Sequence, residues 1–427
     1  MKILFIVPGS GDSFYCGNCF RDSLYADALR RDGHDVVVTP LYLPIKNEAF
    51  RIDAPIFFPA TTFYLAQKFF SHGRVPRPLA RLFGSGFMLR MAASFSGTTT
   101  AKGLEEMTLS MIRGDDAVFA HMAAPLIEWI ATHDKPDIIH ISSSLLSGIA
   151  RVLKQTFMIP TLCSLQDEEV WIDALDEKYA RQAWDGIAAN IKYIDLFVAS
   201  SHFYKKVAQE RIPGLENVEV VYPGVDRQKY AAEHYPQMPT TGFFYHTNRA
   251  NGLDILAGAF ALVKRRGSVP GLRLKVGGGG TFADRKFLKK VKQTLSPWKN
   301  DVEWSDSYDL NSHAEFYKAI SAICVPLTFD EGIGLYLCEA FAAGRPAIEP
   351  ATGSFCESVG EAGVLYSPNT VEALADAIEK LFADSETFGR YCSEAVRLSR
   401  ERYSSEVAAE RLSALYGSLT TRDTRNI

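Results

Sequence analysis

Short runs of β-branched and other apolar residues alternate with helical patterns along most of the chain. In the first half, helical segments such as Arg21–Arg31 separate strand candidates at Lys2–Val7, Asp35–Thr39, Asp137–Ile141, Thr161–Ser164 and Leu196–Ser200. A second series of strand candidates follows at Gly242–Tyr245, Leu272–Val276, Ala322–Pro326 and Ala347–Glu349. Such an alternation predicts parallel βαβ units with helices on both faces of each sheet.

A polar stretch that contains proline, AAEHYPQMPTTG, separates the two series. A chain of 427 residues is also long enough for two cores. We therefore predict an α/β fold of two doubly wound, Rossmann-like domains, at 1–226 and 242–400, joined by a linker at 227–241. The remaining residues, 401–427, are expected to form a helix that packs back on the N-terminal domain, followed by a tail. Because ligands bind at the carboxyl ends of such strands, we expect the site in a cleft between the two domains.

Composition excludes several classes of protein. Hydrophobic residues make up 47% of the chain, charged residues 22%, and the formal net charge is −4, which argues against a nucleic-acid partner. No run of 18 apolar residues occurs, so no membrane-spanning helix is predicted. The start, MKILFIVPGSG, is typical of a buried first strand rather than of a signal peptide. Seven scattered cysteines fit a reducing compartment, so a cytoplasmic protein is expected.

One segment fits neither series, and we predict a helical insertion at about 54–130. Between Ala54 and Leu104 there is no Asp or Glu, and several Phe residues lie among the basic residues. This segment is either a subdomain packed on its own aromatics or a surface for anionic lipid or an anionic acceptor. The second interpretation predicts a peripheral contact with the inner face of a membrane through 54–104. The basic residues are Lys68, Arg74, Arg77, Arg81, Arg90 and Lys102.

The candidate chemistry lies in the stretch EGIGLYLCEA, which begins at Glu331. Gly332 and Gly334 permit a sharp turn and a close approach of the backbone to a ligand. A helix that starts at Leu335 would point its first N–H groups at a phosphate. Glu339, just over one turn inside the helix, could accept hydrogen bonds from both ribose hydroxyls, and Glu331 from hydroxyls beyond the diphosphate. A nucleotide diphosphate sugar satisfies all of these features.

The longer stretch DEGIGLYLCEAFAAGRPAIEPATGSFCESVGEAGVLYSP resembles the signature of the retaining, two-domain glycosyltransferases of the glycogen-synthase-like superfamily, family 4, which have the GT-B architecture. LRRDGHDVVVTPLY, KPDIIHISSSLLSGIA, VVYPGVDRQKY and LRLKVGGGG resemble further parts of that family. The resemblance implies an E-x7-E motif at Glu331 and Glu339. It also implies transfer of a hexose to the hydroxyl of a glycan or a lipid-linked acceptor, with retention, in cell-envelope or exopolysaccharide synthesis. The donor is then the nucleotide diphosphate sugar itself, with no further cofactor and no metal.

The first strand–helix loop departs from the family pattern. A pair of glycines that touches the diphosphate in the family falls here on Cys16 and Gly17, within YCGNC. Gly17 retains backbone access, and Cys16 fills the other place. Cys16 and Cys19 could instead be a redox or metal pair. Since one C-x-x-C supplies only two of the four ligands of a structural zinc, we favour a tight ligand loop and predict no metal site.

Two further departures concern charged and titratable groups. The family's histidine beside the sugar aligns with Gln166, which can hydrogen-bond a hydroxyl but cannot titrate. The acids at 167–169 are either a solvated helix start or catalytic groups. The arginine and lysine that clamp the diphosphate fall on His246 and Asn251, and Arg249 between them is the remaining cation.

The resemblance therefore implies catalysis by positioning and electrostatics rather than by a protein nucleophile. Its catalytic residues are Glu331, Gln166 and Arg249, and its donor-binding residues are Glu339, Gly334, Leu335, Gly17, Cys16, His246, Asn251 and Gly277. The replaced arginine, lysine and histidine motivate an alternative, a non-catalytic relative that binds a nucleotide or glycan. A nicotinamide oxidoreductase is disfavoured, because VGGGG at 276–280 is not a G-x-G-x-x-G that opens a helix.

Overall fold

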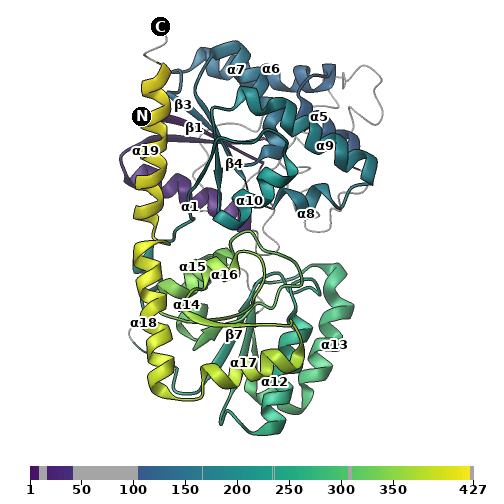
Figure 1. The fold of residues 1–427 in the computed structure, drawn as a ribbon, viewed down its shortest axis with the longest axis vertical. Coiled ribbons are helices and arrows are strands. Elements are labelled where there is room, and N and C mark those ends of the chain that lie inside the picture. The colour runs from purple at the N-terminus through teal and green to yellow at the C-terminus, as the bar shows by residue number, and fades with distance from the viewer. Residues whose placement is uncertain are drawn as a thin grey trace. The chain divides into compact units, whose positions relative to one another are not determined.

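The computed structural model describes residues 1–8, 17–41, 104–165, 167–232, 234, 236–305 and 310–423. It divides into two compact units (Figure 1). The N-terminal unit contains the first strand, Asn18–Val221 and the chain from Ala409 on, and the C-terminal unit contains Tyr222–Ala408. Most of the predicted basic insertion, including all of 54–103, lies outside the described residues.

The N-terminal unit is a six-stranded parallel sheet in the order β2-β1-β3-β4-β5-β6. Its strands are β1 (Lys2–Val7), β2 (Asp35–Pro40), β3 (Ile138–Ile141), β4 (Thr161–Leu165), β5 (Leu196–Ala199) and β6 (Val218–Val220). Its helices are α1 (Gly17–Arg31), α5 (Glu105–Arg113), α6 (Ala117–Thr132), α7 (Ser147–Phe157), α8 (Glu168–Ile172), α9 (Glu177–Asn190) and α10 (His202–Arg211). Strand β1 lies between β2 and β3, so the direction of winding changes between β1 and β3.

The C-terminal unit is a second six-stranded parallel sheet, in the order β12-β11-β10-β7-β8-β9. Its strands are β7 (Thr240–Phe244), β8 (Arg273–Gly277), β9 (Val302–Trp304), β10 (Ala322–Ile323), β11 (Ala347–Pro350) and β12 (Gly363–Tyr366). Its helices are α11 (Arg227–Tyr230), α12 (Leu253–Arg266), α13 (Arg285–Leu295), α14 (Leu310–Lys318), α15 (Leu335–Ala342), α16 (Phe355–Ser358), α17 (Val371–Leu381) and α18 (Ser385–Glu401). Here the winding changes direction between β7 and β10, which confirms two doubly wound, Rossmann-like sheets.

The structure differs from the sequence expectation in three strands that were not predicted, β6, β9 and β12, and in several boundaries. The units divide at Val221, before the predicted linker at 227–241, because α11 packs within the C-terminal unit, where the Tyr230 hydroxyl donates to Glu339. Strand β10 ends at Ile323 instead of reaching Pro326, because the N–H of Val325 bonds to a side chain, Glu349 Oε1, instead of a neighbouring strand.

The last helix, α19 (Ser405–Asp423), is tied to the N-terminal sheet by buried polar contacts from Ala409 on. The Tyr416 hydroxyl lies 2.6 Å from Nδ1 of His140, a residue in the middle of β3. Nε2 of the same imidazole lies 2.7 Å from the Ser164 hydroxyl of β4. Burial lowers the pKa of His140 well below its ordinary value, so the ring is neutral and needs both partners to satisfy its nitrogens.

Among the residues that the structure describes, no helix is both long enough and apolar enough to cross a membrane.

Replacing Tyr416 by Phe should destabilise the protein by about 1–3 kcal/mol, because it leaves one nitrogen of the buried His140 without its partner. Urea unfolding should show a lower midpoint for this variant than for Tyr391→Phe on the surface of α18, where we expect a change within about 0.5 kcal/mol. Equal midpoints for the two variants would contradict this account of how α19 is held.

Candidate functional site

The candidate site is built at the carboxyl ends of β7 and β10, where the winding of the C-terminal sheet changes direction. Tyr245 and His246 follow β7 directly, and the loop after β10 leads through Glu331 to the start of α15. The two segments meet where the Tyr245 hydroxyl donates to Glu331 Oε2 across 3.3 Å. Residues that are 86 positions apart in the chain therefore share one site.

Glu331 is 3% exposed, and its carboxylate turns back on the backbone of its own loop. It accepts from the N–H groups of Gly332, Ile333 and Gly334, in addition to Tyr245. Gly334 occupies the position before the first turn of α15 with φ of +64°, a left-handed conformation that suits glycine. Burial raises the pKa of Glu331 although these hydrogen bonds oppose the shift. A phosphate at this turn would share the amides with Glu331 or displace its carboxylate.

The loop after β11 holds the backbone of Glu331 in place. The N–H of Ser354 donates to the carbonyl oxygen of Glu331 at 3.0 Å. Gly353 has φ of +54°, and a Cβ there would lie 2.8 Å from the backbone nitrogen of Glu331. A side chain at 353 would therefore push Glu331 out of its position.

A second buried acid, Glu349 of β11, lies behind Glu331. It is fully buried, and its Oε1 accepts from the N–H of Val325 at 3.2 Å. Burial and the nearby charge of Glu331 raise the pKa of Glu349 well above its ordinary range, so folding favours the protonated carboxyl. This residue was not among those predicted from the sequence, although an acid inside the otherwise apolar strand Ala347–Pro350 was a usable signal.

Glu339 lies in the interior of the C-terminal unit and is fully buried. Its Oε1 is 2.7 Å from the Tyr230 hydroxyl and 2.8 Å from Nδ1 of His313, and its Oε2 accepts from Tyr317 at 2.9 Å. The predicted contact with ribose hydroxyls stays a prediction. The sequence pattern indicated none of the three partners.

The loop after β7 places the other predicted donor-binding residues. Nε2 of His246 lies 2.9 Å from Asp284 Oδ2, and Asn251, which is buried, donates through its side chain to the carbonyl oxygen of His246 at 2.7 Å. Burial opposes ionisation of Asp284, but hydrogen bonds from Thr281 and the contact with His246 lower its pKa overall. In this arrangement Asn251 shapes the loop, and His246 is the side chain nearer to the solvent.

Arg249 extends from the same loop into solvent, with its side chain 73% exposed. Its guanidinium is 3.9 Å from Asp254 and 5.8 Å from the ring centroid of Phe287 in α13. The exposed side chain is long enough to reach a ligand at the loop without breaking a buried contact.

Glycines at the end of β8 bring the next loop close to Tyr245. At Gly277, a Cβ would lie 2.8 Å from the ring of Phe244. Gly278 has φ of +98°, and a Cβ there would lie 2.3 Å from the carbonyl oxygen of Tyr245. The glycine run therefore lets two loops lie against each other beside the site.

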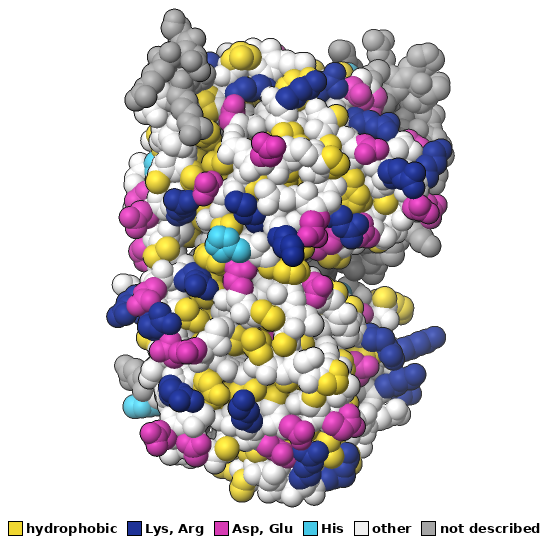
Figure 2. All heavy atoms as spheres, viewed as in Figure 1, with side chains coloured by type: hydrophobic (Ala, Val, Ile, Leu, Met, Phe, Trp, Pro, Cys, Tyr) yellow, Lys and Arg dark blue, Asp and Glu magenta, His cyan; other side chains and the backbone are white. Residues whose placement is uncertain are grey.

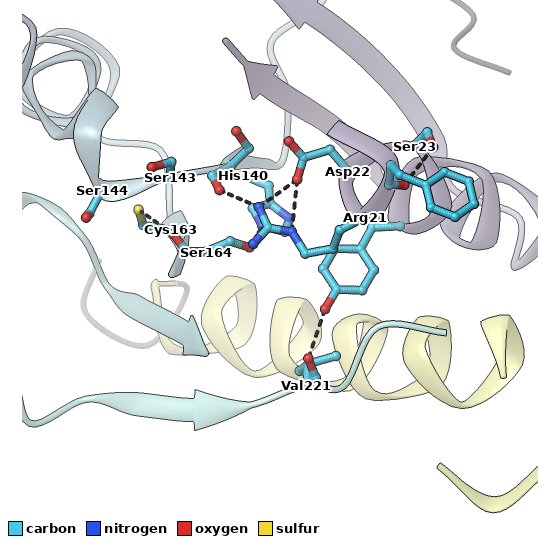
Figure 3. Close-up of polar contacts among 12 residues, drawn as sticks. Arg21, Asp22, Ser23, His140, Ser143, Ser144, Cys163, Ser164 and Val221 are labelled. Atoms are coloured by element: carbon cyan, nitrogen blue, oxygen red, sulfur yellow. Dashed lines mark hydrogen bonds and ion pairs between the residues drawn. The ribbon is translucent and has the colours of Figure 1, made fainter. Parts of the chain in front are cut away.

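Cys16 and Gln166 lie outside the described residues, and Gly17 is the first residue of α1, the helix that connects β1 and β2 of the N-terminal sheet. A buried ion pair that the sequence did not indicate lies near the change in winding of this sheet (Figure 3). Arg21 Nη2 donates to Asp22 Oδ1 at 2.8 Å and to the carbonyl oxygen of Ser142 at 2.6 Å. Burial raises the pKa of Asp22 to about 6, with Arg21 opposing the shift.

The acids at 167–169 were open to two interpretations, and the solvated helix start is wrong for Glu168. This side chain is buried. Its Oε1 accepts from the Ser143 hydroxyl and the Ser144 N–H, both at 3.1 Å, and its Oε2 lies 2.7 Å from the Tyr204 hydroxyl. Glu168 thus organises the loop after β3, and its buried position resembles that of Glu331 in the other unit.

Among the described residues there is no group of three or more His, Cys, Asp or Glu side chains arranged to hold a metal ion.

Replacing Glu349 by Gln should stabilise the protein more at pH 8 than at pH 5. The raised folded-state pKa means that the folded protein binds a proton that the unfolded chain releases above about pH 4.3. Wild-type stability is therefore lost as the pH rises between the two pKa values, by about 1.4 kcal/mol per pH unit, whereas Gln does not titrate. Melting temperatures at both pH values measure the difference. Glu372→Gln on the surface of α17 is the matched control. If the difference in melting temperature between Glu349→Gln and the wild type did not change with pH, the account of the buried proton would be contradicted.

Part of the chain matches a known family of proteins. Residues 237–384 match the family model described as Glycosyl transferases group 1, a range that contains Tyr245, Glu331, Glu339 and Glu349. A curated relative, the D-inositol 3-phosphate glycosyltransferase of Corynebacterium glutamicum, is 29% identical over 212 residues. The match covers 48% of this chain and 50% of the relative, so the chain spans about half the length of that protein.

Two solved structures share the whole fold. The sucrose-phosphate synthase of Thermosynechococcus elongatus superposes with a TM-score of 0.72 at 17% identity, over 99% of this chain and all of the other. Anabaena HepE, in complex with UDP and glucose, superposes with a TM-score of 0.67 at 15% identity, over 98% of this chain and all of the other.

These two superpositions confirm the fold class predicted from the sequence, an α/β fold of two Rossmann-like domains. Residues 237–384 are thus similar to the Glycosyl transferases group 1 family, and they lie within a fold of two Rossmann-like domains that solved GT-B glycosyltransferases share.

Proposed function

We propose that the protein is a retaining glycosyltransferase that moves a hexose from a nucleotide diphosphate sugar to an acceptor hydroxyl, in cell-envelope or exopolysaccharide glycan synthesis. The observation that carries the proposal is the turn at Glu331, where a buried carboxylate, three backbone N–H groups and the Tyr245 hydroxyl converge at the β7–β10 change in winding. This turn lies within the part of the chain that matches the family model. It combines acceptors for sugar hydroxyls with donors for phosphate oxygens.

In this proposal the protein catalyses by position and charge. The transition state is oxocarbenium-like, and the departing phosphate helps to take the proton from the acceptor hydroxyl, so no protein nucleophile is needed. Glu331 holds the hexose, and the first amides of α15 meet the leaving diphosphate together with Arg249. Fixed donors aimed at developing negative charge give the largest stabilisation when water is excluded. Gly17, Cys16 and Gln166 are proposed to serve the same ligand, and His246 is the next candidate for the diphosphate.

The donor is proposed to be a nucleoside diphosphate hexose, bound without a metal. The solved structure of HepE with UDP and glucose supports this class of donor, as does the name of the D-inositol 3-phosphate glycosyltransferase for a hydroxyl acceptor. A glycan or lipid-linked acceptor is the proposed partner of the N-terminal unit.

A cytoplasmic location is proposed as well, with peripheral contact to the inner face of the membrane through 54–104. The proposed membrane contact rests on the absence of acids in that basic segment of the sequence.

A second candidate, binding of nucleotide or glycan without turnover, is favoured by specific observations. Glu339 is satisfied by side chains of its own unit, and Asn251 stands where the family has a cation. The two candidates differ in one measurement, which is release of the nucleoside diphosphate from UDP-, GDP- and ADP-sugars. Calorimetric binding of a nucleotide without any release from its sugar would favour the non-catalytic protein.

Replacing Glu331 by Gln should reduce kcat about a hundredfold while nucleotide affinity changes less than threefold, because its proposed partner is the transferred sugar. Replacing Glu339 by Gln should instead weaken nucleotide binding by about 1–3 kcal/mol. Because Glu339 is buried, Tyr317→Phe is the control, since it removes one donor to the same carboxylate and leaves the acid in place. Calorimetry and steady-state kinetics separate the effects. If Glu339→Gln and Tyr317→Phe lowered the melting temperature equally and neither changed nucleotide affinity, Glu339 would be a structural acid.

Replacing Arg249 by Gln should raise the barrier by roughly 2–4 kcal/mol if its guanidinium meets the charge that develops on the diphosphate. Its exposed position predicts a change in folding stability within about 0.5 kcal/mol. Turnover and melting temperature are compared with those of Arg265→Gln, an exposed arginine of α12. Unchanged turnover in Arg249→Gln would remove Arg249 from the catalytic residues.

A further inference from the structure

The C-terminal unit carries an exposed basic surface on α13 and the 3-10 helix that follows it, Ser296–Asp301. From Arg285 to Asn300 the sequence contains no Asp or Glu, in a chain whose net charge is −4. We call this set of exposed cations the α13 surface. Its members are Arg285, Lys286, Lys289, Lys290, Lys292 and Lys299.

The helix is oriented so that these cations face outward. Val291 and Leu295 are buried, and they lie on the side of α13 opposite to the cations, which recur at the i, i+4 spacing of one helix face. In Figure 1, α13 lies at the outer edge of its unit, and in Figure 2 dark blue side chains gather at the same edge. Arg285, Lys289 and Lys292 line a shallow hollow of about 480 Å³ on this face.

In the part of the chain that the structure describes, three acids that flank the α13 surface in sequence are engaged elsewhere. Asp284 contacts His246 and Thr281. Asp301 pairs with Lys264 at 2.8 Å, and Glu303 pairs with Lys275 at 2.7 Å. The positive charge of the surface is therefore not neutralised by the acids that flank it.

A large aromatic side chain stands beside these cations. Phe282, in the turn just before α13, is 75% exposed, and the guanidinium of Arg285 lies 4.4 Å from its ring centroid. Moving an aromatic ring out of water is favourable, so burial of the Phe282 ring against a partner would contribute to binding free energy. An exposed ring next to long basic side chains is typical of surfaces that contact lipid headgroups, where the cations meet phosphates and the ring enters the acyl boundary.

We propose that the α13 surface docks the C-terminal unit on an anionic lipid bilayer, with Phe282 inserted at headgroup depth. A nucleic acid would meet the same cations, but single-stranded nucleic acids bind to grooves lined by several stacking rings, whereas one ring is exposed here and the chain is acidic overall. This surface is separate in sequence from the basic segment 54–104. The α13 surface also adjoins the loop after β7, since the guanidinium of Arg249 in that loop lies over the ring of Phe287 in α13. Given the proposed function, a bilayer bound there favours a lipid-linked acceptor.

The test is co-sedimentation of the full chain with phosphatidylcholine vesicles that contain or lack phosphatidylglycerol, at low and raised salt. The wild type should bind only the anionic vesicles and lose binding as salt rises. Each cation near an anionic surface contributes a factor of about five in binding, so changing Lys286, Lys289 and Lys290 together to Gln should weaken binding about a hundredfold. Phe282→Ser should weaken binding to the same vesicles without changing its salt dependence.

A matched control removes three exposed cations from other helices, by changing Lys206, Arg265 and Arg390 to Gln. This control should bind as the wild type does. Both triple variants should release nucleoside diphosphate at the wild-type rate on a water-soluble acceptor, so a failure of the proposed enzyme activity is seen separately from a failure of docking. Wild-type binding by the α13 triple variant would overturn the proposal and assign the contact to 54–104. Equal binding to both kinds of vesicle, no binding to either, or binding to single-stranded RNA in preference to anionic vesicles would also overturn it.

Discussion

The turn that leads into α15 depends on one buried carboxylate and the backbone amides that surround it. Glu331 accepts from the N–H groups of Gly332, Ile333 and Gly334, so its carboxylate closes the loop that leads into the helix. Three other features of the site are arranged around Glu331. Tyr245 reaches it from β7, Gly353 permits the close approach of the β11 loop, and Ser354 bonds its carbonyl oxygen. Burial raises the pKa of Glu331, and the hydrogen bonds from the amides oppose this shift.

Behind this turn, hydrogen bonds from backbone and side-chain groups hold two further buried acids. Burial raises the pKa of Glu349, and its Oε1 accepts from the N–H of Val325, just after β10. Glu339 is surrounded by Tyr230, Tyr317 and His313. A buried acid without such partners costs several kcal/mol of folding free energy. Removing one partner therefore destabilises the protein by more than a single hydrogen bond contributes. The two acids of the E-x7-E motif are therefore held in different ways. Backbone amides hold Glu331 at the carboxyl ends of the strands, and side chains hold Glu339 in the interior.

The sequence predicted both sheets but missed β6, β9 and β12, of which β6 and β9 have only three residues each, too few for a clear periodicity. β-Branched runs marked the strands, and glycine and proline marked most of their ends. It also located the turn at Glu331, because glycines beside an acid at the start of a helix are typical of a turn that binds a polar ligand. The partners of those acids were not predictable in this way. Tyr230 lies 109 residues before Glu339, and Tyr245 lies 86 before Glu331, so only the tertiary fold brings them together. The end of β10 failed for a related reason, since a distant side chain, Glu349, bonds the N–H of Val325.

The central claim is that a nucleoside diphosphate binds at the turn before α15. Hydrogen exchange of the backbone amides, followed by mass spectrometry with and without UDP, GDP and ADP, tests this claim most directly. With at least one of the three nucleotides, the account predicts slower exchange in peptides that cover 328–340 and 245–252, because the ligand covers amides that border Glu331. Unchanged exchange in both peptides with all three nucleotides at saturating concentration, or protection confined to other parts of the chain, would contradict it.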